Sequence, residues 1–291
     1  MSRVIENLAE VAHQYDAAFV DLWGCVHNGV TAFPEAVAAL QQFRAAGKKV
    51  VLLTNAPRAR AEVQKQLGQW SVPDDAWDVI ATSGDSARAA MFRGAVGSKV
   101  WFIGQPFDQT FFEPLHIVKD PVAIEQVALE EAEGIVCTGP FDPFADPEEM
   151  RGQFLYAKQK GMKLLCANPD IVVDRGESRE WCAGALAKLY TEMGGESLYF
   201  GKPHPPIYDL ARARLAEVGG DPAGPILCIG DGVLTDVKGA MGEGLDCVFI
   251  SGGLGALETG TAPGGQPVQE KLDEYLAHHQ MATTYAIGFL R

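Results

Sequence analysis

Several polar residues follow apolar runs in this sequence, and together they could transfer a phosphoryl group. Asp21 follows one such run, and a carboxylate in that position can attack phosphorus as a nucleophile. Thr54 and Asn55 follow another run and offer a hydroxyl, an amide and backbone N–H groups to phosphate oxygens. Lys202 supplies a positive charge for the phosphoryl group and could orient Asp21. The sequence therefore predicts a phosphate-handling site.

A second set of carboxylates indicates a metal ion. Asp231 follows a further apolar run, and Asp236 lies just past the turn. Phosphoryl transfer needs a hard cation with oxygen ligands, usually magnesium held by carboxylates, waters and the substrate phosphate. Because the carboxyl ends of parallel strands meet at one edge of an open sheet, we expect Asp231 and Asp236 to lie beside Asp21. The sequence therefore predicts a Mg²⁺ site there.

The elements that must position these residues alternate between strands and helices. Continuous apolar runs predict buried parallel strands, and amphipathic spacing predicts helices between them. The predicted strands lie over residues 17–20, 49–53, 79–81, 225–229 and 247–250, the predicted helices over 2–15, 34–46, 58–67, 205–218, 235–241 and 271–279, and a long loop over 255–266. This order is typical of an α/β fold with a doubly wound parallel sheet.

The middle of the chain has strands and helices of its own, which predicts an inserted α/β domain. Its predicted strands lie over residues 99–104, 134–139 and 163–167, and a predicted helix lies over 147–160. The alternation of helices and strands seen in the first part of the chain resumes with a predicted helix over 184–193 and a predicted strand over 197–200. We therefore assign residues 1–81 and 180–291 to a catalytic core and residues 82–179 to the insertion.

The composition limits the classes of partner. The chain has 291 residues, 47% of them hydrophobic, a length that suits one large or two medium domains. Its net charge is −14, from 24 basic and 38 acidic residues. Because non-specific nucleic-acid binding depends on neutralising phosphates, this charge argues against a nucleic-acid partner, and it disfavours binding to anionic membranes.

The cysteines and the first residues favour a cytoplasmic protein. The six cysteines form no Cys-x-x-Cys pair, so we expect reduced thiols. Residues 1–16 are mixed and charged, without an apolar signal segment, and no apolar run approaches the length that spans a membrane. We therefore expect a soluble protein of the cytoplasm.

The order of the motifs resembles the haloacid dehalogenase (HAD) superfamily. The resemblance rests on Asp21, the pair Thr54-Asn55, Lys202 and the stretch Gly230-Asp231-x-x-x-x-Asp236. The insertion resembles the class IIA cap of NagD-like sugar and nucleotide phosphatases. Three stretches are similar to that subclass in particular: Ala167-Asn168-Pro169-Asp170, Ala183-Gly184-Ala185-Leu186 and Gly201-Lys202-Pro203.

The resemblance implies a fold and a chemistry. It implies a Rossmann-like core, an α/β cap, magnesium and hydrolysis of a phosphomonoester. In the family pattern Asp21 is the nucleophile, and Lys202 is the second catalytic residue. The metal ligands that the pattern implies are Asp21, the backbone carbonyl of Trp23, Asp231 and Asp236.

Position 23 departs from the family pattern. Phosphatases of the family carry Asp-x-Asp, and the second Asp protonates the leaving group and later activates water. Here the sequence is Asp21-Leu22-Trp23, and tryptophan cannot transfer a proton. Three interpretations stay open: a phosphatase that uses His27, Asn28 or a leaving group needing little protonation, an enzyme of altered chemistry, and a non-catalytic phosphate-ligand binder.

The predicted cap and the first loop supply the candidates for substrate recognition. In the cap these are Asp142, Asn168, Asp170 and Arg175. Arg175 could hold a second anionic group of the substrate, or form an ion pair with a neighbouring acidic residue. Trp23 could stack on a substrate ring or pack against the cap. His27 is either the missing acid or a turn histidine that faces solvent.

These residues lead to one expectation and one alternative. We expect a magnesium-dependent phosphoric-ester hydrolase that acts on a small phosphorylated metabolite, such as a sugar phosphate or nucleotide, through an aspartyl-phosphate intermediate. Thr54, Asn55, Lys202, Trp23, Asn168 and Arg175 are the substrate-binding candidates. The alternative is a catalytically impaired phosphate-ligand-binding or regulatory protein. A homodimer is compatible with the sequence.

Overall fold

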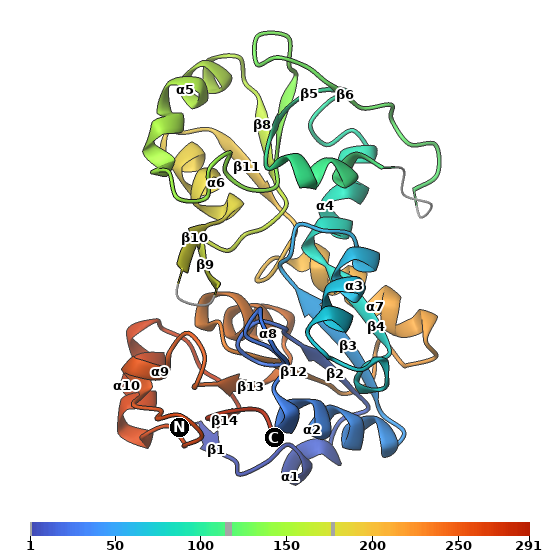
Figure 1. The fold of residues 1–291 in the computed structure, drawn as a ribbon, viewed down its shortest axis with the longest axis vertical. Helices are drawn as coiled ribbons and strands as arrows, with labels where there is room; N and C mark the ends of the chain where they lie inside the picture. Colours follow the sequence, from blue (N-terminus) through green and yellow to red (C-terminus); the bar gives the residue numbers. More distant parts are fainter. Residues whose placement is uncertain (1, 114–117, 176–177) are drawn as a thin grey trace. The chain divides into compact units, whose positions relative to one another are not determined.

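The computed structural model describes residues 2–113, 118–175 and 178–291, which form two compact units (Figure 1). The first unit comprises Met1–Thr54, Gln64–Ala81 and Lys202–Arg291, and the second comprises Asn55–Val63 and Thr82–Gly201. Each unit has a parallel sheet of its own with helices around it. The predicted α/β class is confirmed.

The sheet of the first unit has the strand order β1-β14-β13-β12-β2-β3-β4. Its strands are β1 (Arg3–Val4), β2 (Ala17–Val20), β3 (Lys49–Thr54), β4 (Val79–Thr82), β12 (Ile226–Gly230), β13 (Asp246–Ile250) and β14 (Tyr285–Ile287). Neighbouring strands from β1 to β3 in this order run parallel, so their carboxyl ends lie along one edge. β2 lies between β12 and β3 and is buried along its whole length, as its apolar run predicts.

Helices cover this sheet. They are α1 (Ala9–Ala12), α2 (Pro34–Ala45), α3 (Arg60–Gln69, which begins in the second unit), α7 (Pro205–Glu217), α8 (Lys238–Glu243), α9 (Ala256–Thr259), α10 (Gln269–His278), the 3₁₀ helix η1 (Asp74–Ala76) and the π-helix η4 (Val233–Val237). Phe19 and Phe249 of the sheet belong to one buried cluster with Ile207 and Tyr208 of α7 and Leu272 of α10. This cluster fixes the strands whose ends carry the site.

Both ends of the chain differ from the prediction. The helix predicted over residues 2–15 is wrong, because β1 forms an edge strand paired with β14 and only the four residues of α1 are α-helical there. The predicted loop over 255–266 contains α9. β1 and α9 are short, and the pairing of β1 with a strand near the other end of the chain leaves no hydrophobic pattern in the local sequence. Figure 1 shows both termini beside β1 and β14.

The second unit has a five-stranded parallel sheet in the order β11-β8-β7-β5-β6 and an antiparallel hairpin, β9–β10. The strands are β5 (Lys99–Ile103), β6 (Glu125–Gln126), β7 (Gly134–Cys137), β8 (Lys163–Cys166), β9 (Val172–Arg175), β10 (Ser178–Trp181) and β11 (Glu196–Tyr199). The helices are α4 (Ser83–Phe92), α5 (Arg151–Gln159), α6 (Ala183–Glu192) and the 3₁₀ helices η2 (Pro106–Phe112) and η3 (Pro147–Met150). The hairpin was not predicted.

The chain returns to the first unit later than the sequence predicts. β11 pairs with β8, and Tyr190 of α6 packs on Phe154 and donates to Met162 O at 2.6 Å. The segment after residue 180 therefore belongs to the second unit as far as Gly201. The sequence could not predict this, because an apolar run does not tell which sheet a strand joins. The roles of the two units as catalytic core and cap stay predictions.

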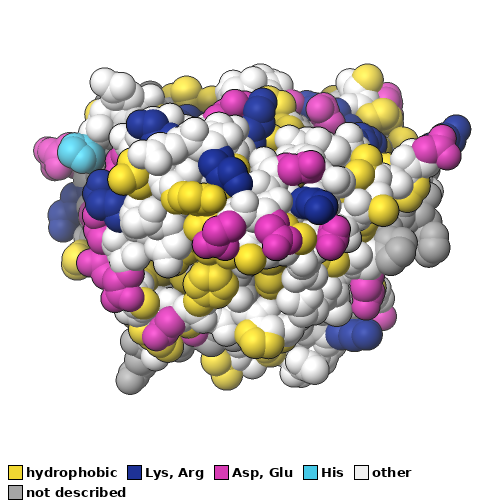
Figure 2. Space-filling view, turned by 90° about the horizontal axis from the view of Figure 1, so that it is seen from above, with side chains coloured by type: hydrophobic (Ala, Val, Ile, Leu, Met, Phe, Trp, Pro, Cys, Tyr) yellow, Lys and Arg dark blue, Asp and Glu magenta, His cyan; other side chains and the backbone are white. Residues whose placement is uncertain are grey.

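The surface mixes charges of both signs on the face that Figure 2 shows. Acidic and basic side chains are interspersed there, so the residues coloured in that view form no continuous basic patch. Among the described residues, no helix is long and apolar enough to cross a membrane.

Candidate active site

The strand register brings the predicted site residues to one edge of the first sheet. Val20 of β2 lies opposite Ile229 of β12, and the backbone N–H of Asp21 donates to Ile229 O at 2.8 Å. Asp231 follows the end of β12, and Thr54 ends β3 on the other side of β2. The carboxyl ends of three neighbouring strands thus carry Asp21, Asp231 and Thr54, as the sequence predicts.

Lys202 is the cation of this edge. Its Nζ donates to Asp21 Oδ1 at 2.6 Å and to Asp236 Oδ1 at 2.8 Å. The lysine side chain is 3% exposed, so both contacts are shielded from water and are stronger than surface ion pairs. Lys202 therefore joins the predicted nucleophile to one of the predicted metal ligands.

Asp236 is turned toward Lys202 by the π-helix η4. The backbone N–H of Gly232 donates to Asp236 Oδ2 at 3.1 Å, and Thr235 Oγ1 donates to the same oxygen at 3.3 Å. A Cβ at Gly230 would lie 2.1 Å from Asp236 Cγ, so only glycine permits this approach. The helix predicted from residue 235 is therefore wrong in its first turn, which is the wider π type that often marks functional sites.

Asp231 is held by the loop after β13. The backbone N–H of Leu254 donates to Asp231 Oδ2 at 3.0 Å. A Cβ at Gly24 or at Gly253 would lie 2.1 or 2.0 Å from that oxygen, so both glycines let the backbone close around the carboxylate. Sequence reasoning missed Gly253 and Leu254. The glycine pair at the exit of β13, beside the exit of β12, is the signal that could have found them.

Three buried carboxylates share this edge with one lysine. Burial raises the pKa of Asp21 to about 7, Lys202 opposes this shift, and Asp236 adds to it. Burial and the charge of Asp21 raise the pKa of Asp231 well above its usual range. Burial lowers the pKa of Lys202, but the charges of Asp21 and Asp236 outweigh burial and raise it. The cluster therefore has too little positive charge to offset the burial of Asp21 and Asp231.

A divalent cation fits this arrangement. An oxygen of Asp21 and an oxygen of Asp231 lie within 4.8 Å of each other, close enough for one ion to contact both. Carboxylate oxygens are the ligands that Mg²⁺ and Ca²⁺ prefer, and two positive charges would balance three carboxylates paired with one lysine. The chemistry of the donors thus suits a hard divalent ion.

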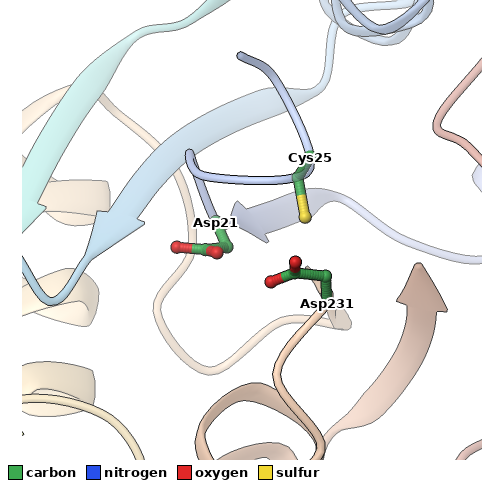
Figure 3. Close-up of side chains that lie close together, drawn as sticks. All are labelled: Asp21, Cys25 and Asp231. Carbon is green, nitrogen blue, oxygen red and sulfur yellow. The ribbon is translucent and has the colours of Figure 1, made fainter. Parts of the chain in front are cut away.

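Cys25 lies against the two carboxylates, a contact that sequence reasoning missed. Its Sγ lies within 4.8 Å of an oxygen of Asp21 and of Asp231. Figure 3 shows the three side chains converging: Asp21 at the end of its strand, Cys25 on the loop that follows, and Asp231 after β12. Burial and the charge of Asp231 raise the pKa of the Cys25 thiol well above its usual range. Its position in the loop directly after Asp21 is the signal that could have found it.

Trp23 packs on other aromatic rings of the first unit. Its ring centroid lies 5.3 Å from that of His27 and 6.1 Å from that of Trp70, both in edge-on contacts. A Cβ at Gly29, where φ is +80°, would lie 2.3 Å from Trp23 Cη2, so the turn is shaped to the indole. We call Trp23, His27 and Trp70 the aromatic cluster.

His27 is enclosed in the aromatic cluster. The residue is 0% exposed, and its ring centroid lies 4.4 Å from that of Trp70. Its Nδ1 accepts the backbone N–H of Gly29 at 3.0 Å, and its Nε2 is buried without a hydrogen-bond partner among the described residues. Burial lowers the pKa of His27 to about 4, so the ring is neutral at pH 7 with its proton on Nε2. The expectation of a solvent-facing turn histidine is therefore wrong, because the turn folds the ring inward.

In the second unit, Asn55 and Asn168 both bind Asp170. Asn55 Nδ2 donates to Asp170 Oδ1 at 2.8 Å, and the backbone N–H of Asp170 donates to Asn168 Oδ1 at 3.0 Å. Both asparagines are buried. The structure thus brings together three polar residues that the sequence singles out in this unit, while their role in phosphate or substrate binding stays a prediction.

Two other candidates are placed by their strands. Thr54 is buried at the end of β3. The backbone of Arg175 ends β9, paired with Ser178 of β10, and its side chain lies outside the part of the chain that the structure describes. The predicted roles of Thr54 and Arg175 stay predictions.

Two family models match the chain. Residues 18–117 match a model described as a haloacid dehalogenase-like hydrolase, and residues 199–275 match a model described as HAD-hydrolase-like. The first match includes Asp21 and Thr54, and the second includes Lys202, Asp231 and Asp236.

Two curated proteins are similar in sequence. A dihydroxyacetone phosphatase of Corynebacterium glutamicum (strain R) is 32% identical over 95 residues, which are 32% of this chain and 33% of the relative. A D-glycerol 3-phosphate phosphatase of Mycobacterium tuberculosis (strain ATCC 25618 / H37Rv) is 25% identical over 255 residues, which are 85% of this chain and 66% of the relative. The chain thus spans one third of the first relative and just under two thirds of the second.

Solved structures extend the likeness to the whole chain. The glycerol phosphate phosphatase Rv1692 of Mycobacterium tuberculosis in complex with magnesium has the same fold, with a TM-score of 0.62 and 22% identity over 87% of this chain and 73% of that one. A haloacid dehalogenase-like hydrolase from Brucella suis 1330 is 39% identical, with a TM-score of 0.83, over 99% of this chain and 100% of that one. With its charged cluster at the strand ends and this likeness along its full length, the chain belongs to the haloacid dehalogenase-like hydrolase family.

Proposed function

We propose that this protein is a magnesium-dependent phosphatase that acts through an aspartyl-phosphate intermediate. The observation that carries the proposal is the pair of hydrogen bonds from Lys202 to Asp21 and Asp236 inside a buried cluster that also holds Asp231. Buried charges are costly for a fold, and an apolar core would serve stability at least as well. Such a cluster is therefore best explained by chemistry.

In the proposed reaction Asp21 attacks the phosphorus atom of the substrate. The bond from phosphorus to the leaving oxygen breaks, and its electron pair stays on that oxygen. Water then attacks phosphorus, the bond to Asp21 breaks, and both protons of the water leave on inorganic phosphate, which restores the Asp21 carboxylate. Lys202 orients Asp21 and balances charge on the phosphoryl oxygens, and Thr54 donates its hydroxyl to them.

Asp21, Asp231, Asp236 and the backbone carbonyl of Trp23 would hold the metal. A divalent cation supplies the positive charge that this cluster lacks and offsets the charge of the phosphoryl group. Support comes from the raised pKa values of Asp21 and Asp231, since a cation would keep both carboxylates ionised. Magnesium is the proposed ion because it binds through carboxylates and substrate phosphate.

The proposed substrate is a small phosphorylated metabolite, such as a sugar phosphate or nucleotide. The names of the two curated relatives, a dihydroxyacetone phosphatase and a D-glycerol 3-phosphate phosphatase, favour a small molecule. Asn55, Asn168 and Arg175 are the proposed recognition residues of the second unit, and Trp23 that of the first. A cytoplasmic location and a homodimer stay predictions.

A panel of phosphate esters tests the proposal. We expect release of inorganic phosphate from at least one ester in the presence of Mg²⁺, and loss of that release when a chelator removes the ion. Trp23 in place of the usual acid favours one other function, a phosphate-ligand binder with little turnover. Binding of Mg²⁺ and of phosphorylated ligands without phosphate release from any ester, p-nitrophenyl phosphate included, would overturn the phosphatase and establish the binder.

A further inference from the structure

We propose that Trp23 restricts this enzyme to substrates whose leaving group departs as a stable anion without receiving a proton. The substrate class is then acyl phosphates, phosphoanhydrides and esters of acidic hydroxyls, and not the phosphate esters of simple alcohols. The inference rests on the proposed phosphatase function. It also differs from what the names of the two curated relatives suggest, since both name alcohol phosphates.

The first observation is that the indole at position 23 belongs to the surrounding loop. Its ring packs over Gly29 and makes edge contacts with His27 and Trp70. The positive φ of Gly29 and the absence of room there for a Cβ indicate a turn built around the indole. Tryptophan has an N–H donor only and does not titrate, so it can neither protonate a leaving oxygen nor activate water.

The second observation is that His27 and Asn28 do not replace the acid. His27 is 0% exposed between the rings of Trp23 and Trp70, so a substrate oxygen cannot reach its Nε2 without opening the aromatic cluster. Asn28 Oδ1 accepts the backbone N–H groups of Val30 and Thr31 at 3.0 and 2.9 Å, which makes Asn28 a turn residue. The two polar neighbours of Trp23 in the sequence thus serve the loop.

The third observation is that Lys202 and Cys25 are engaged by the carboxylates of the site. Lys202 binds two carboxylates, and Cys25 is turned toward Asp21 and Asp231 (Figure 3). Attack by Asp21 on phosphorus remains available. In that step the bond from phosphorus to the leaving oxygen breaks and the electron pair stays on this oxygen, which leaves as an anion. A simple alcohol, with a pKa near that of water (~16), leaves poorly in this way, whereas a carboxylate (~4) leaves readily.

The leaving-group dependence of kcat/KM tests the inference. The probes are a series of substituted phenyl phosphates ordered by the pKa of the phenol, with acetyl phosphate and glycerol phosphate as the two extremes. kcat/KM is the right quantity because it reports the first irreversible step, departure of the leaving group. We expect kcat/KM to fall steeply as the pKa of the phenol rises. We also expect kcat/KM for acetyl phosphate to exceed that for glycerol phosphate at least ~10²-fold, the lower end of what a general acid contributes.

Two variants of position 23 separate the missing acid from a change of shape. Trp23→Asp introduces the acid, and Trp23→Asn is the matched control of the same size without a proton to give. We expect Trp23→Asp to weaken the dependence of kcat/KM on the pKa of the leaving group. We also expect it to raise kcat/KM for glycerol phosphate ~10²- to 10⁴-fold relative to Trp23→Asn. Circular dichroism and Mg²⁺ binding show whether each variant is folded, and the wild-type series stands as a test even if neither is.

The outcomes distinguish this inference from the proposed function. Turnover with a shallow dependence on the leaving group, or glycerol phosphate as good a substrate as acetyl phosphate, would overturn the inference and leave the phosphatase in place. If folded Trp23→Asp and Trp23→Asn show the same dependence of kcat/KM on the pKa of the leaving group, the inference is also overturned. No turnover of any probe would overturn the proposed function itself.

Discussion

Two groups of side chains flank Leu22, and they differ in charge, polarity and packing. Before Leu22, Asp21 belongs to a charged cluster, in which Lys202 and Asp236 form buried ion pairs. After it, Trp23 belongs to the aromatic cluster, in which a neutral His27 lies between two indoles. Both groups are in the first unit, and Asp21 and Trp23 are only two residues apart in the sequence.

If the proposed mechanism holds, the difference means that the residues for attack on phosphorus and the residues for proton transfer lie in separate groups. In the proposed mechanism the charged cluster supplies the nucleophile, the cation and the carboxylates that would hold a metal. The aromatic cluster buries apolar rings, which stabilises the loop but handles no protons. A chain with no remaining chemistry would gain little from buried ion pairs, so we infer that the first half-reaction is intact and that the proton steps have changed.

Removing the nucleophile should have the largest effect. We expect Asp21→Asn to lower kcat for any phosphate ester at least ~10³-fold, because loss of a covalent nucleophile removes the reaction path itself. Asp16→Asn, at the exposed position just before β2, is the matched control and should leave kcat unchanged within a factor of about two. Turnover that persists in Asp21→Asn contradicts the assignment of the charged cluster.

The two groups should respond to pH with opposite sign in metal-free protein. His27 has a folded pKa of about 4, below its unfolded value, so it contributes stability above pH 6.5 that is lost as the pH falls toward 4, on the order of 3 kcal/mol in full. Asp21 has a folded pKa of about 7, above its unfolded value, so its contribution is present below pH 4 and is lost as the pH rises through 7.

Urea unfolding from pH 4 to 8 with a chelator present measures both effects. We expect His27→Asn to lose the decline in unfolding free energy on the acid side, and Asp21→Asn to lose the decline toward neutral pH. If both variants follow the wild-type profile at a constant offset, neither residue has the environment that we describe.

Magnesium should stabilise the charged cluster. At a concentration of 100 times the dissociation constant, we expect Mg²⁺ to add ~2.7 kcal/mol to the free energy of unfolding, because the ion binds the folded chain only. Asp231→Asn should lose most of this gain, whereas Asp209→Asn, on the exposed side of α7, should keep it. Thermal unfolding with and without the ion measures the difference. An equal gain in both variants would place the metal elsewhere.

The turn beneath Trp23 should show a difference between two matched glycines. Gly29 and Gly47 both have φ near +80°, but a Cβ at Gly29 meets the Trp23 ring whereas a Cβ at Gly47 meets nothing within 4 Å. We expect Gly47→Ala to cost ~1 kcal/mol for the backbone alone, and Gly29→Ala to cost ~1–3 kcal/mol more for the displaced ring. Equal losses in chemical denaturation would show that Trp23 does not shape the turn.

Local patterns were enough to predict the charged cluster. Asp21 and Asp231 follow the ends of apolar strands and Thr54 ends one, and parallel strands bring such ends together, so these three residues could be placed from the sequence. Asp236 and Lys202 followed from the motif order. Cys25 and Leu254 were missed because their signals, the loop position after Asp21 and the glycine pair after β13, indicate a close backbone approach but do not name the carboxylate that is contacted.

Patterns failed where a contact depends on distant parts of the chain. The burial of His27 depends on Trp70, more than forty residues further on, so the histidine looked like a surface turn residue. β11 has the sequence pattern of any short strand, and its pairing with β8 depends on tertiary structure. The predicted domain boundary at residue 180 therefore differs from the boundary between the two units. The edge strand β1 owes its conformation to β14 at the opposite end of the chain.

A rapid-quench experiment tests most directly whether attack is intact while the proton steps are impaired. Wild-type protein with Mg²⁺ is mixed with excess p-nitrophenyl phosphate, and p-nitrophenolate and phosphorylated protein are followed together. We predict a burst that approaches one p-nitrophenolate per active site, with phosphate on Asp21, followed by slow turnover, because this leaving group needs no acid but hydrolysis of the intermediate lacks the usual base. Linear product release from the first turnover, without phosphorylated protein, would contradict the account.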